Sequence, residues 1–245
     1  MTPIKYNLNA LKIINDLSSI SKTKDGNTPI KFVKDLEGIH VRSGNSAKTI
    51  VFAVDLPSES FDIPNPTLSF YDYSEFYKYV TTFPDATLSF GLVNEGSERE
   101  FEGIIITKDR KKISYQTSDD ETISGSMKSL KHPDPTTSFN FNSENFVQLK
   151  KIINLFHSDD VLIKLKFSGK FVDISIKAEN IETLYEDQFE LDIEIEKEFE
   201  IVIRHEIFKH LLNTNYVVEA SEEYQCLFFN FVFESIKGSI LVTGE

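Results

Sequence analysis

Two short sequence patterns occur twice along the chain, in the same order. Leu11–Asn15 (LKIIN) is repeated at Lys150–Asn154 (KKIIN), and Glu75–Lys78 (EFYK) is repeated at Glu206–Lys209 (EIFK). Each copy lies in a segment with helical spacing of apolar residues, and strand-like alternation follows it. Repetition on this scale constrains the fold more than any local pattern, because both copies must adopt the same topology. The sequence therefore predicts two similar units.

Apolar residues recur every three to four positions in four segments, which predicts four amphipathic helices. We expect these helices at residues 7–24, 74–83, 143–157 and 204–215, with Ser143 as the N-cap of the third. Each helix carries at least one lysine on the polar side, opposite its apolar stripe. The sequence therefore predicts four helices with lysine-bearing polar faces.

Alternation of apolar and polar residues predicts that most of the remaining chain forms β-strands. The alternation is clearest at residues 161–167 and 189–196, and we expect turns at Gly169 and at Glu196–Glu198. Strands and helices in this order are typical of an α+β fold, in which the helices gather on one side of antiparallel sheets.

Residues 124–137 interrupt all periodicity and contain one glycine and two prolines. Such a segment is typical of a linker. We therefore expect an N-terminal domain at residues 1–123 and a C-terminal domain at residues 138–245, joined by this linker.

The composition limits the classes of protein to which the chain can belong. Its 245 residues include 26 basic and 39 acidic ones, a formal net charge of -13, and taken as a whole this balance argues against a polyanionic partner. The single cysteine, Cys226, excludes an internal disulfide and a cysteine-cluster metal site, and we expect a buried, inert thiol. No apolar run is long enough for a membrane helix or a signal peptide. We expect a cytoplasmic protein, in the host cytoplasm if the chain is viral.

Motifs for catalysis or cofactor binding are missing from the sequence: it has no phosphate-binding loop, nucleophile elbow or EF-hand pattern. His205 and His210 come closest to a metal-binding pair. They are five residues apart and would diverge by about 140° around a helix, whereas a zinc-binding helix spaces its histidines four apart. We expect no metal, no cofactor and no enzymatic activity. An enzyme whose catalytic residues are scattered along the sequence is the remaining alternative.

The order and spacing of these features resemble a DNA sliding clamp, the processivity factor of DNA polymerases. The resemblance covers most of the chain and is strongest to the trimeric clamps of T-even-like tailed bacteriophages, which are related to proliferating cell nuclear antigen. It is carried by the duplicated KIIN helices and the proline-containing linker. It is also carried by two strand-to-helix passages, Phe189–Glu196 through Phe199–Arg204 into the helix at Glu206, and Leu68–Asp72 into the helix at Glu75.

The resemblance implies the DNA clamp fold: two similar domains, each with antiparallel sheets outside and two helices on the inner face. It also implies a homotrimeric ring that encircles double-stranded DNA without sequence preference and tethers the replicative DNA polymerase. A clamp loader ATPase would be a further partner. The alternative function is that of a β-rich structural or scaffold protein of a phage particle.

Helices line the hole of such a ring, so the resemblance assigns their polar faces to DNA. The charge distribution agrees with this assignment: the four expected helical segments hold eight basic and four acidic residues, a net of +4, which leaves -17 for the rest of the chain. The alternative is that these lysines only keep the surface soluble. The residues expected to face DNA are Lys12, Asn15, Lys22, Lys78, Lys150, Lys151, Asn154 and Lys209.

The resemblance also pairs an edge strand at about residues 111–117 of one subunit with an edge strand at about 181–187 of the next. The first strand is basic and the second acidic, so opposite charges would set the partner and the register. Alternatively, each strand is a free edge protected by its charges. The expected interface residues are Lys108, Arg110, Lys111 and Lys112 on one side, and Glu179, Glu182, Glu186 and Asp187 on the other.

Partners of sliding clamps insert a short hydrophobic peptide into a pocket beside the linker. The resemblance implies that this pocket is formed by residues in the linker and in the last strands. The alternative is that all of them pack in the core or in the linker. The candidates are Met127, Leu130, Leu227, Ile240 and Val242.

Overall fold

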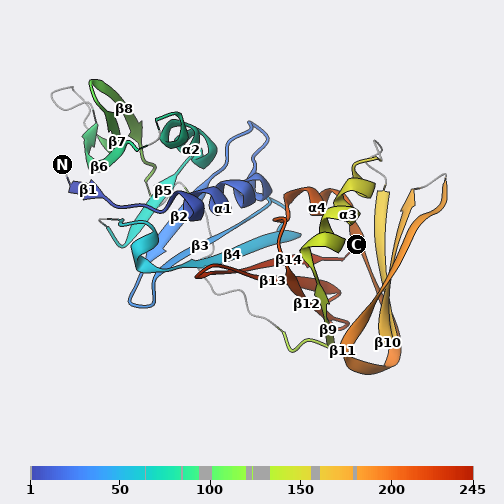
Figure 1. Ribbon diagram of the computed structural model, residues 1–245. Coiled ribbons are helices and arrows are strands. Elements are labelled where there is room, and N and C mark those ends of the chain that lie inside the picture. The colour runs from blue at the N-terminus through green and yellow to red at the C-terminus, as the bar shows by residue number, and fades with distance from the viewer. Residues whose placement is uncertain are drawn as a thin grey trace. The chain divides into compact units, whose positions relative to one another are not determined.

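The computed structural model describes residues 2–63, 65–83, 85–93, 101–119, 123, 133–155, 161–178 and 181–244, without the side chains of residues 2, 101, 178 and 181–184. The chain divides into two compact units (Figure 1). The first unit comprises Met1–Ser46 and Ala53–Lys128, and the second comprises Ala47–Phe52 and Ser129–Glu245. The break after Lys128 lies inside the expected linker, most of which is outside the described residues.

The first unit combines two helices with antiparallel strands. One sheet has the strand order β1-β6-β7-β8, and strands β4, β3, β2 and β5 lie side by side in that order. Helices α1 and α2 pack together, and the Tyr73 hydroxyl on α2 donates a hydrogen bond to the carbonyl oxygen of Leu11 on α1. The elements are β1 (Thr2–Ile4), α1 (Leu8–Ser18), a 3-10 turn (Ser19–Ser21), β2 (Ile30–Lys34), β3 (Ile39–Gly44), β4 (Ile50–Leu56), a second 3-10 turn (Ser58–Ser60), β5 (Thr67–Phe70), α2 (Tyr73–Thr82), β6 (Thr87–Val93), β7 (Phe101–Lys108) and β8 (Lys111–Gln116).

The second unit follows the same plan. Its strands have the order β10-β11-β9-β12-β13-β14, and each strand pairs with its neighbours in an antiparallel direction. The elements are β9 (Thr137–Phe141), α3 (Ser143–Ile153), β10 (Val161–Ala178), β11 (Ile181–Arg204), α4 (Glu206–His210), β12 (Tyr216–Ser221), β13 (Cys226–Phe233) and β14 (Ile236–Thr243). The α+β class expected from the sequence is confirmed.

An asparagine or aspartate caps each of the three longer helices. Asn7 accepts hydrogen bonds from the backbone of Asn9 and Ala10, Asp72 from Glu75, and Asn142 from Asn145. The expected N-cap Ser143 is therefore wrong by one residue, and Ser143 is the first helical residue.

The helices are shorter than the apolar spacing predicts. The first helix ends in the 3-10 turn, which leaves Lys22 and Lys24 beyond it, and α3 ends at Ile153 rather than near residue 157. The prediction fails most at residues 204–215, where α4 is five residues long because Leu211 turns into extended backbone (ψ 145°). Apolar spacing continues past these ends because turn residues also cover the core.

Strands β10 and β11 form one long antiparallel ribbon (Figure 1), so the turns expected at Gly169 and at Glu196–Glu198 are wrong. The pairing register shifts around Gly169, whose φ of +54° bends the strand as a bulge without ending it. Phe167 stacks on Phe199 with ring centroids 4.5 Å apart. Cross-strand ion pairs fix the register on the other face, and these are Lys164–Glu200, Lys166–Glu198 and Lys170–Glu194.

Phenylalanine and tyrosine rings fill the core of each unit, which accounts for most of the 21 phenylalanines of a chain without tryptophan. In the first unit, Phe70 contacts Tyr73 and Phe76 of α2, with ring centroids 5.3 and 4.6 Å apart. In the second, Phe146 of α3 contacts Phe141 of β9 and Phe208 of α4 at 5.6 and 5.8 Å. These edge-on, tilted and stacked contacts add to the stabilisation from area burial and hold the helices against the strands.

A charged cluster joins four residues that are not adjacent in sequence, from β3, from β4 and from the turn after β2. His40 Nδ1 lies 2.8 Å from Asp55 Oδ1, His40 Nε2 lies 3.0 Å from Asp35 Oδ1, and Arg42 donates to Asp55 at 2.6 Å. Because both ring nitrogens face carboxylates, the arrangement favours the doubly protonated imidazolium. Burial alone would lower the pKa of His40, but the hydrogen bonds to Asp55 and Asp35 outweigh it and raise this pKa.

Replacing His40 by glutamine should therefore destabilise the protein only in a limited pH range. A raised histidine pKa stabilises the fold below the ordinary value of 6.5, and this contribution is lost as the pH rises through the folded-state pKa. The pKa of Asp55 is lowered, because hydrogen bonds from His40 and Arg42 outweigh burial, so its contribution is lost as the pH falls. We expect a loss of about 1 kcal/mol in the free energy of unfolding at pH 5.5 and little loss at pH 9. Urea denaturation at both pH values measures it, and an equal loss at both would contradict the proposed pairing.

Candidate nucleic-acid face and subunit edges

The polar faces of α1 and α2 carry Lys12 and Lys78, both exposed, and Asn15 is half-buried. Lys12 donates to Asp16 at 2.5 Å, one helical turn further along, and this hydrogen bond raises the pKa of Lys12. Lys22 is exposed in the loop after the 3-10 turn. The helices of the first unit thus present lysines, but one of them is already paired with an acid.

In the second unit, Lys151, Asn154 and Lys209 are exposed at the C-terminal ends of α3 and α4. Lys150 differs from its neighbours, because its ammonium donates to the carbonyl oxygen of Leu211 at 2.9 Å and to Asn213 Oδ1 at 3.1 Å. This ammonium also lies 5.5 Å from the centre of the Phe146 ring. Lys150 therefore ties the end of α4 to α3, a role that the sequence did not indicate.

The observed helix ends change the charge count. Within α1 to α4 there are five basic residues (Lys12, Lys78, Lys150, Lys151, Lys209) and four acidic ones (Asp16, Glu75, Glu144, Glu206), a net of +1 rather than +4. Three further cations, Lys22, Lys24 and Arg204, are exposed just outside the helices. In each unit, positive charge near the helices therefore depends on the helix ends and the loops that follow them.

Strand β8 is an edge strand of the first unit, next to β7 alone in its sheet order. Lys112, Ser114 and Gln116 are exposed on one face, whereas Tyr115 is buried on the other against Phe70 and Phe76. The ammonium of Lys111 lies 5.7 Å from the Phe83 ring, at the end of α2. Arg110 is exposed in the turn before β8, and Lys108 ends β7. Lys111 and Lys112 therefore lie on the edge strand itself, whereas Arg110 lies in the turn and Lys108 on the neighbouring strand β7.

In the second unit, β11 pairs with β10 on one side and meets β9 on the other at Leu191, among the described residues. Glu186 is exposed, and Asp187 is half-buried and accepts hydrogen bonds from Tyr185 and Gln188. Glu182 belongs to β11, but its side chain lies outside the described residues, as does all of Glu179. The described part of this edge is thus acidic as expected.

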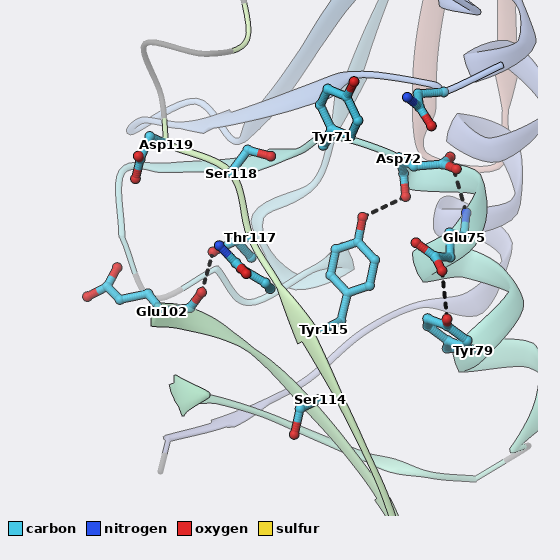
Figure 2. Close-up of a pocket in the computed structure, with 12 residues that line it drawn as sticks. Tyr71, Asp72, Glu75, Tyr79, Glu102, Ser114, Tyr115, Thr117, Ser118 and Asp119 are labelled. Atoms are coloured by element: carbon cyan, nitrogen blue, oxygen red, sulfur yellow. Dashed lines mark hydrogen bonds between the residues drawn. The ribbon is translucent and has the colours of Figure 1, made fainter. Parts of the chain in front are cut away.

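A groove of about 950 Å³ runs between the C-terminal half of β8 and the start of α2 (Figure 2). Tyr71, Glu75, Tyr79 and Tyr115 line it, together with Asp119 at its far end. The Tyr115 hydroxyl donates to the carbonyl oxygen of Asp72 and the Tyr79 hydroxyl to Glu75, so both rings are fixed in place. Sequence reasoning missed this groove, because its residues come from separate elements.

The candidates for a peptide pocket need correction. Leu227, Ile240 and Val242 are fully buried on β13 and β14, because strand alternation points them into the core of the second unit. They therefore offer no surface to a peptide, and the core alternative is the correct one for them. Met127 and Leu130 lie outside the described residues.

No group of three or more metal-ligating side chains occurs in the described part of the chain. His205 is buried, and its Nδ1 lies 3.0 Å from the carbonyl oxygen of Val161. Cys226 is buried as expected, and burial raises the pKa of its thiol. Among the described residues, no helix has the length and apolar character needed to cross a membrane.

Comparison with solved structures shows the same fold along the whole chain. The proliferating cellular nuclear antigen of Entamoeba histolytica matches with a TM-score of 0.70 and 14% identity, over 99% of this chain and 98% of that one. The A. fulgidus protein, solved with the C-terminal region of FEN-1 bound, matches with a TM-score of 0.72 and 12% identity, over 100% and 98%. The Thermococcus kodakaraensis protein gives 0.64 and 12%, over 99% of both chains.

No protein-family model and no curated protein matches the sequence. The likeness is therefore one of fold: the chain has the fold of proliferating cell nuclear antigen and related sliding clamps, as the sequence resemblance implied.

Replacing Lys150 by methionine tests its structural role. Methionine keeps an apolar stem against Phe146 but leaves the Leu211 carbonyl and Asn213 without their donor. We expect the free energy of unfolding to fall by about 1 kcal/mol. The exposed neighbour is the control: Lys151→Met should change it by less than about 0.5 kcal/mol. Urea denaturation compares the two, and equal effects would show that the contacts of Lys150 contribute nothing.

Proposed function

We propose that the chain is the subunit of a non-catalytic ring that encircles double-stranded DNA and tethers a replicative DNA polymerase. The observation that carries the proposal is the fold match, which extends over essentially the whole of this chain and of each clamp. The earlier resemblance makes a phage replicative polymerase the expected partner, with a clamp loader ATPase that opens the ring.

The exposed cations on the helices and at their ends suit loose contact with phosphates. In the proposed ring, Lys22, Lys78, Lys151 and Lys209 face DNA, with Asn15 and Asn154 as neutral donors. Lysine ammonium groups on flexible stems contact phosphates without reading bases, so they permit sliding. Lys12 contributes less, because Asp16 neutralises it, and Lys150 contributes mainly by positioning α4. Retention on DNA then comes from ring closure rather than from affinity.

Ring closure in this proposal joins the basic edge at β8 to the acidic edge at β11 of the next subunit. Each of the two strands exposes backbone N–H and C=O groups that could otherwise pair with another chain and cause aggregation. Pairing the two strands with each other satisfies these groups. The charge difference favours the head-to-tail contact over contact between like edges. By analogy with clamps made of two-domain chains, three subunits complete the ring.

Mass in solution and polymerase stimulation test the proposal together. We expect a particle of three times 28.1 kDa in sedimentation and longer products when the protein, a clamp loader and ATP are added to the cognate polymerase on a primed circular template. A stable monomer or an open polymer would instead favour the structural alternative. A trimer that leaves product length unchanged would refute the tethering function.

Salt dependence tests the DNA-facing residues. The affinity for DNA falls as salt rises, and each phosphate contact contributes about -0.9 to the slope of log affinity against log salt. The double variant Lys151→Gln/Lys209→Gln loses two contacts, so its slope should be less negative by about 2. A short linear duplex, onto whose ends a ring can thread, is a suitable target. The control double variant Lys197→Gln/Lys237→Gln removes the same charge from exposed strand positions. If both pairs lower the slope equally, net charge rather than the helical face governs binding.

A further inference from the structure

The first turn of α2 is held by a residue that lies far away in the sequence. The first backbone N–H groups of a helix have no acceptor within the helix. In α2, Thr28 supplies two of the missing acceptors: its carbonyl oxygen accepts from the N–H of Tyr73 at 3.0 Å, and its hydroxyl oxygen accepts from that of Ser74 at 2.9 Å. The N-cap Asp72 supplies a third, because its Oδ1 accepts from the N–H of Glu75 at 3.3 Å.

Thr28 and Asp72 are also bonded to each other. The Thr28 hydroxyl donates to Asp72 Oδ1 at 2.7 Å, so this one hydroxyl group accepts from the helix and donates to its cap. Thr28 is only 4% exposed, and a hydroxyl group buried to this extent is costly unless it is hydrogen-bonded. The carbonyl oxygen of Asp72 accepts from the Tyr115 hydroxyl at 2.7 Å (Figure 2). The start of α2 is therefore fixed to the loop before β2 and to β8.

Two side chains of the same turn reach α1. The Tyr73 hydroxyl donates to the carbonyl oxygen of Leu11 at 3.1 Å, and the Ser74 hydroxyl oxygen lies 3.3 Å from that of Ser18. The turn that Thr28 holds therefore also sets the spacing between the two helices of the first unit.

The equivalent helix of the second unit has no such anchor. The repeat matches Glu206 with Glu75; three residues before Glu75 stands Asp72, whereas three residues before Glu206 stands Ile203. An isoleucine side chain accepts no hydrogen bond, and α4 has no side-chain cap. Accordingly, α2 begins two residues before Glu75, but α4 begins at Glu206 itself and is five residues long. The contact between Thr28 and Asp72 thus accounts for the additional residues at the start of α2.

Lys78 lies in the middle of α2 and is exposed. Its carbonyl oxygen accepts from the Thr82 hydroxyl at 2.7 Å, whereas its counterpart in the repeat, Lys209, is the penultimate residue of α4. Each residue of a helix follows the last with a fixed rotation and rise, so a helix that is fixed at its first turn points its later side chains in fixed directions. The direction of the Lys78 side chain therefore depends on how the first turn is held.

We propose that Thr28 is a positioning residue for the contact of α2 with DNA. Through Asp72 it sets the start and the direction of α2, and thereby the place of the Lys78 ammonium. Thr28 itself is buried, so it acts without touching DNA. This inference rests on the proposed function, in which Lys78 faces DNA, and it names the residues on which that contact depends.

The salt dependence of binding to a short linear duplex tests the inference. Lys78→Gln should make the slope of log affinity against log salt less negative by about 0.9, the share of one phosphate contact. Thr28→Val removes the hydroxyl group and keeps the branched shape, and it should make the slope less negative by a similar amount. Thr28→Ser keeps the hydroxyl group and should retain the wild-type slope.

Combined variants separate positioning from a general loss of stability. If Thr28 acts through Lys78, adding Lys78→Gln to Thr28→Val should change the slope by less than about a third of its effect in the wild-type protein. Adding Lys151→Gln, on α3 of the other unit, should still change the slope by about 0.9. A loss of folded protein alone lowers the bound fraction by the same factor at every salt concentration, so it leaves the slope unchanged.

Asp72 offers a second pair of variants, which serves if Thr28→Val does not fold. Asp72→Ala removes the cap and the acceptor of the Thr28 hydroxyl, and it should reproduce the less negative slope. Asp72→Asn keeps a side-chain oxygen that caps the helix and accepts from Thr28. Both variants remove the same charge, so the difference in slope between them isolates the hydrogen bonds.

The outcomes separate the positioning role from the ring. A wild-type slope in Thr28→Val or equal slopes in the two Asp72 variants, beside a reduced slope in Lys78→Gln, overturns the positioning role while the ring stands. An unchanged slope in Lys78→Gln overturns it as well, because Lys78 then contacts no phosphate. A wild-type protein that sediments as a monomer, or that binds the duplex without salt dependence, overturns the proposed function and this inference with it.

Discussion

Every strand in this protein must satisfy its backbone N–H and C=O groups on both sides, and this requirement shapes the molecule more than any single side chain. Within each unit the antiparallel ladders meet it, and rings such as Phe70 and Phe146 fix helices over the sheets so formed. What remains are the strand edges. The sheet orders end in β1, β5, β8 and β10, and residues 185–190 of β11 pair with β10 but with no strand on their other side among the described residues.

The repeat and the strand alternation predicted the two units and the α+β class, because both features reflect which side chains are buried. Helix ends were predicted less well, since apolar residues continue to cover the core after α4 has stopped at His210. The ribbon of β10 and β11 was predicted as separate strands because a bulging glycine and a turning glycine look alike in sequence. Gly169 has a positive φ in either case.

Some side-chain roles could be predicted from local sequence, and others depend on contacts between residues far apart in the chain. Exposed lysines such as Lys151 could be placed from the helical wheel alone. The inward attachment of Lys150 could not, because its acceptors, Leu211 and Asn213, lie far along the chain. The cluster around His40 had a faint signal in the alternation of His40 and Arg42 on one face, but only the pairing of β3 with β4 brings Asp55 to them. The net charge of -13 does not describe its distribution, because the helices carry +1 and the rest of the chain -14.

The second unit cannot be obtained whole by cutting the chain at the linker, because part of it comes from the N-terminal half of the sequence. Residues 47–52 belong to the second unit, and the N–H of Thr243 donates to the carbonyl oxygen of Thr49 across 194 positions of sequence. A fragment cut at the linker would keep β14 but lose this partner, and its last strand would become an open template for aggregation. During synthesis, likewise, the second unit cannot be completed until the ribosome has nearly finished the chain.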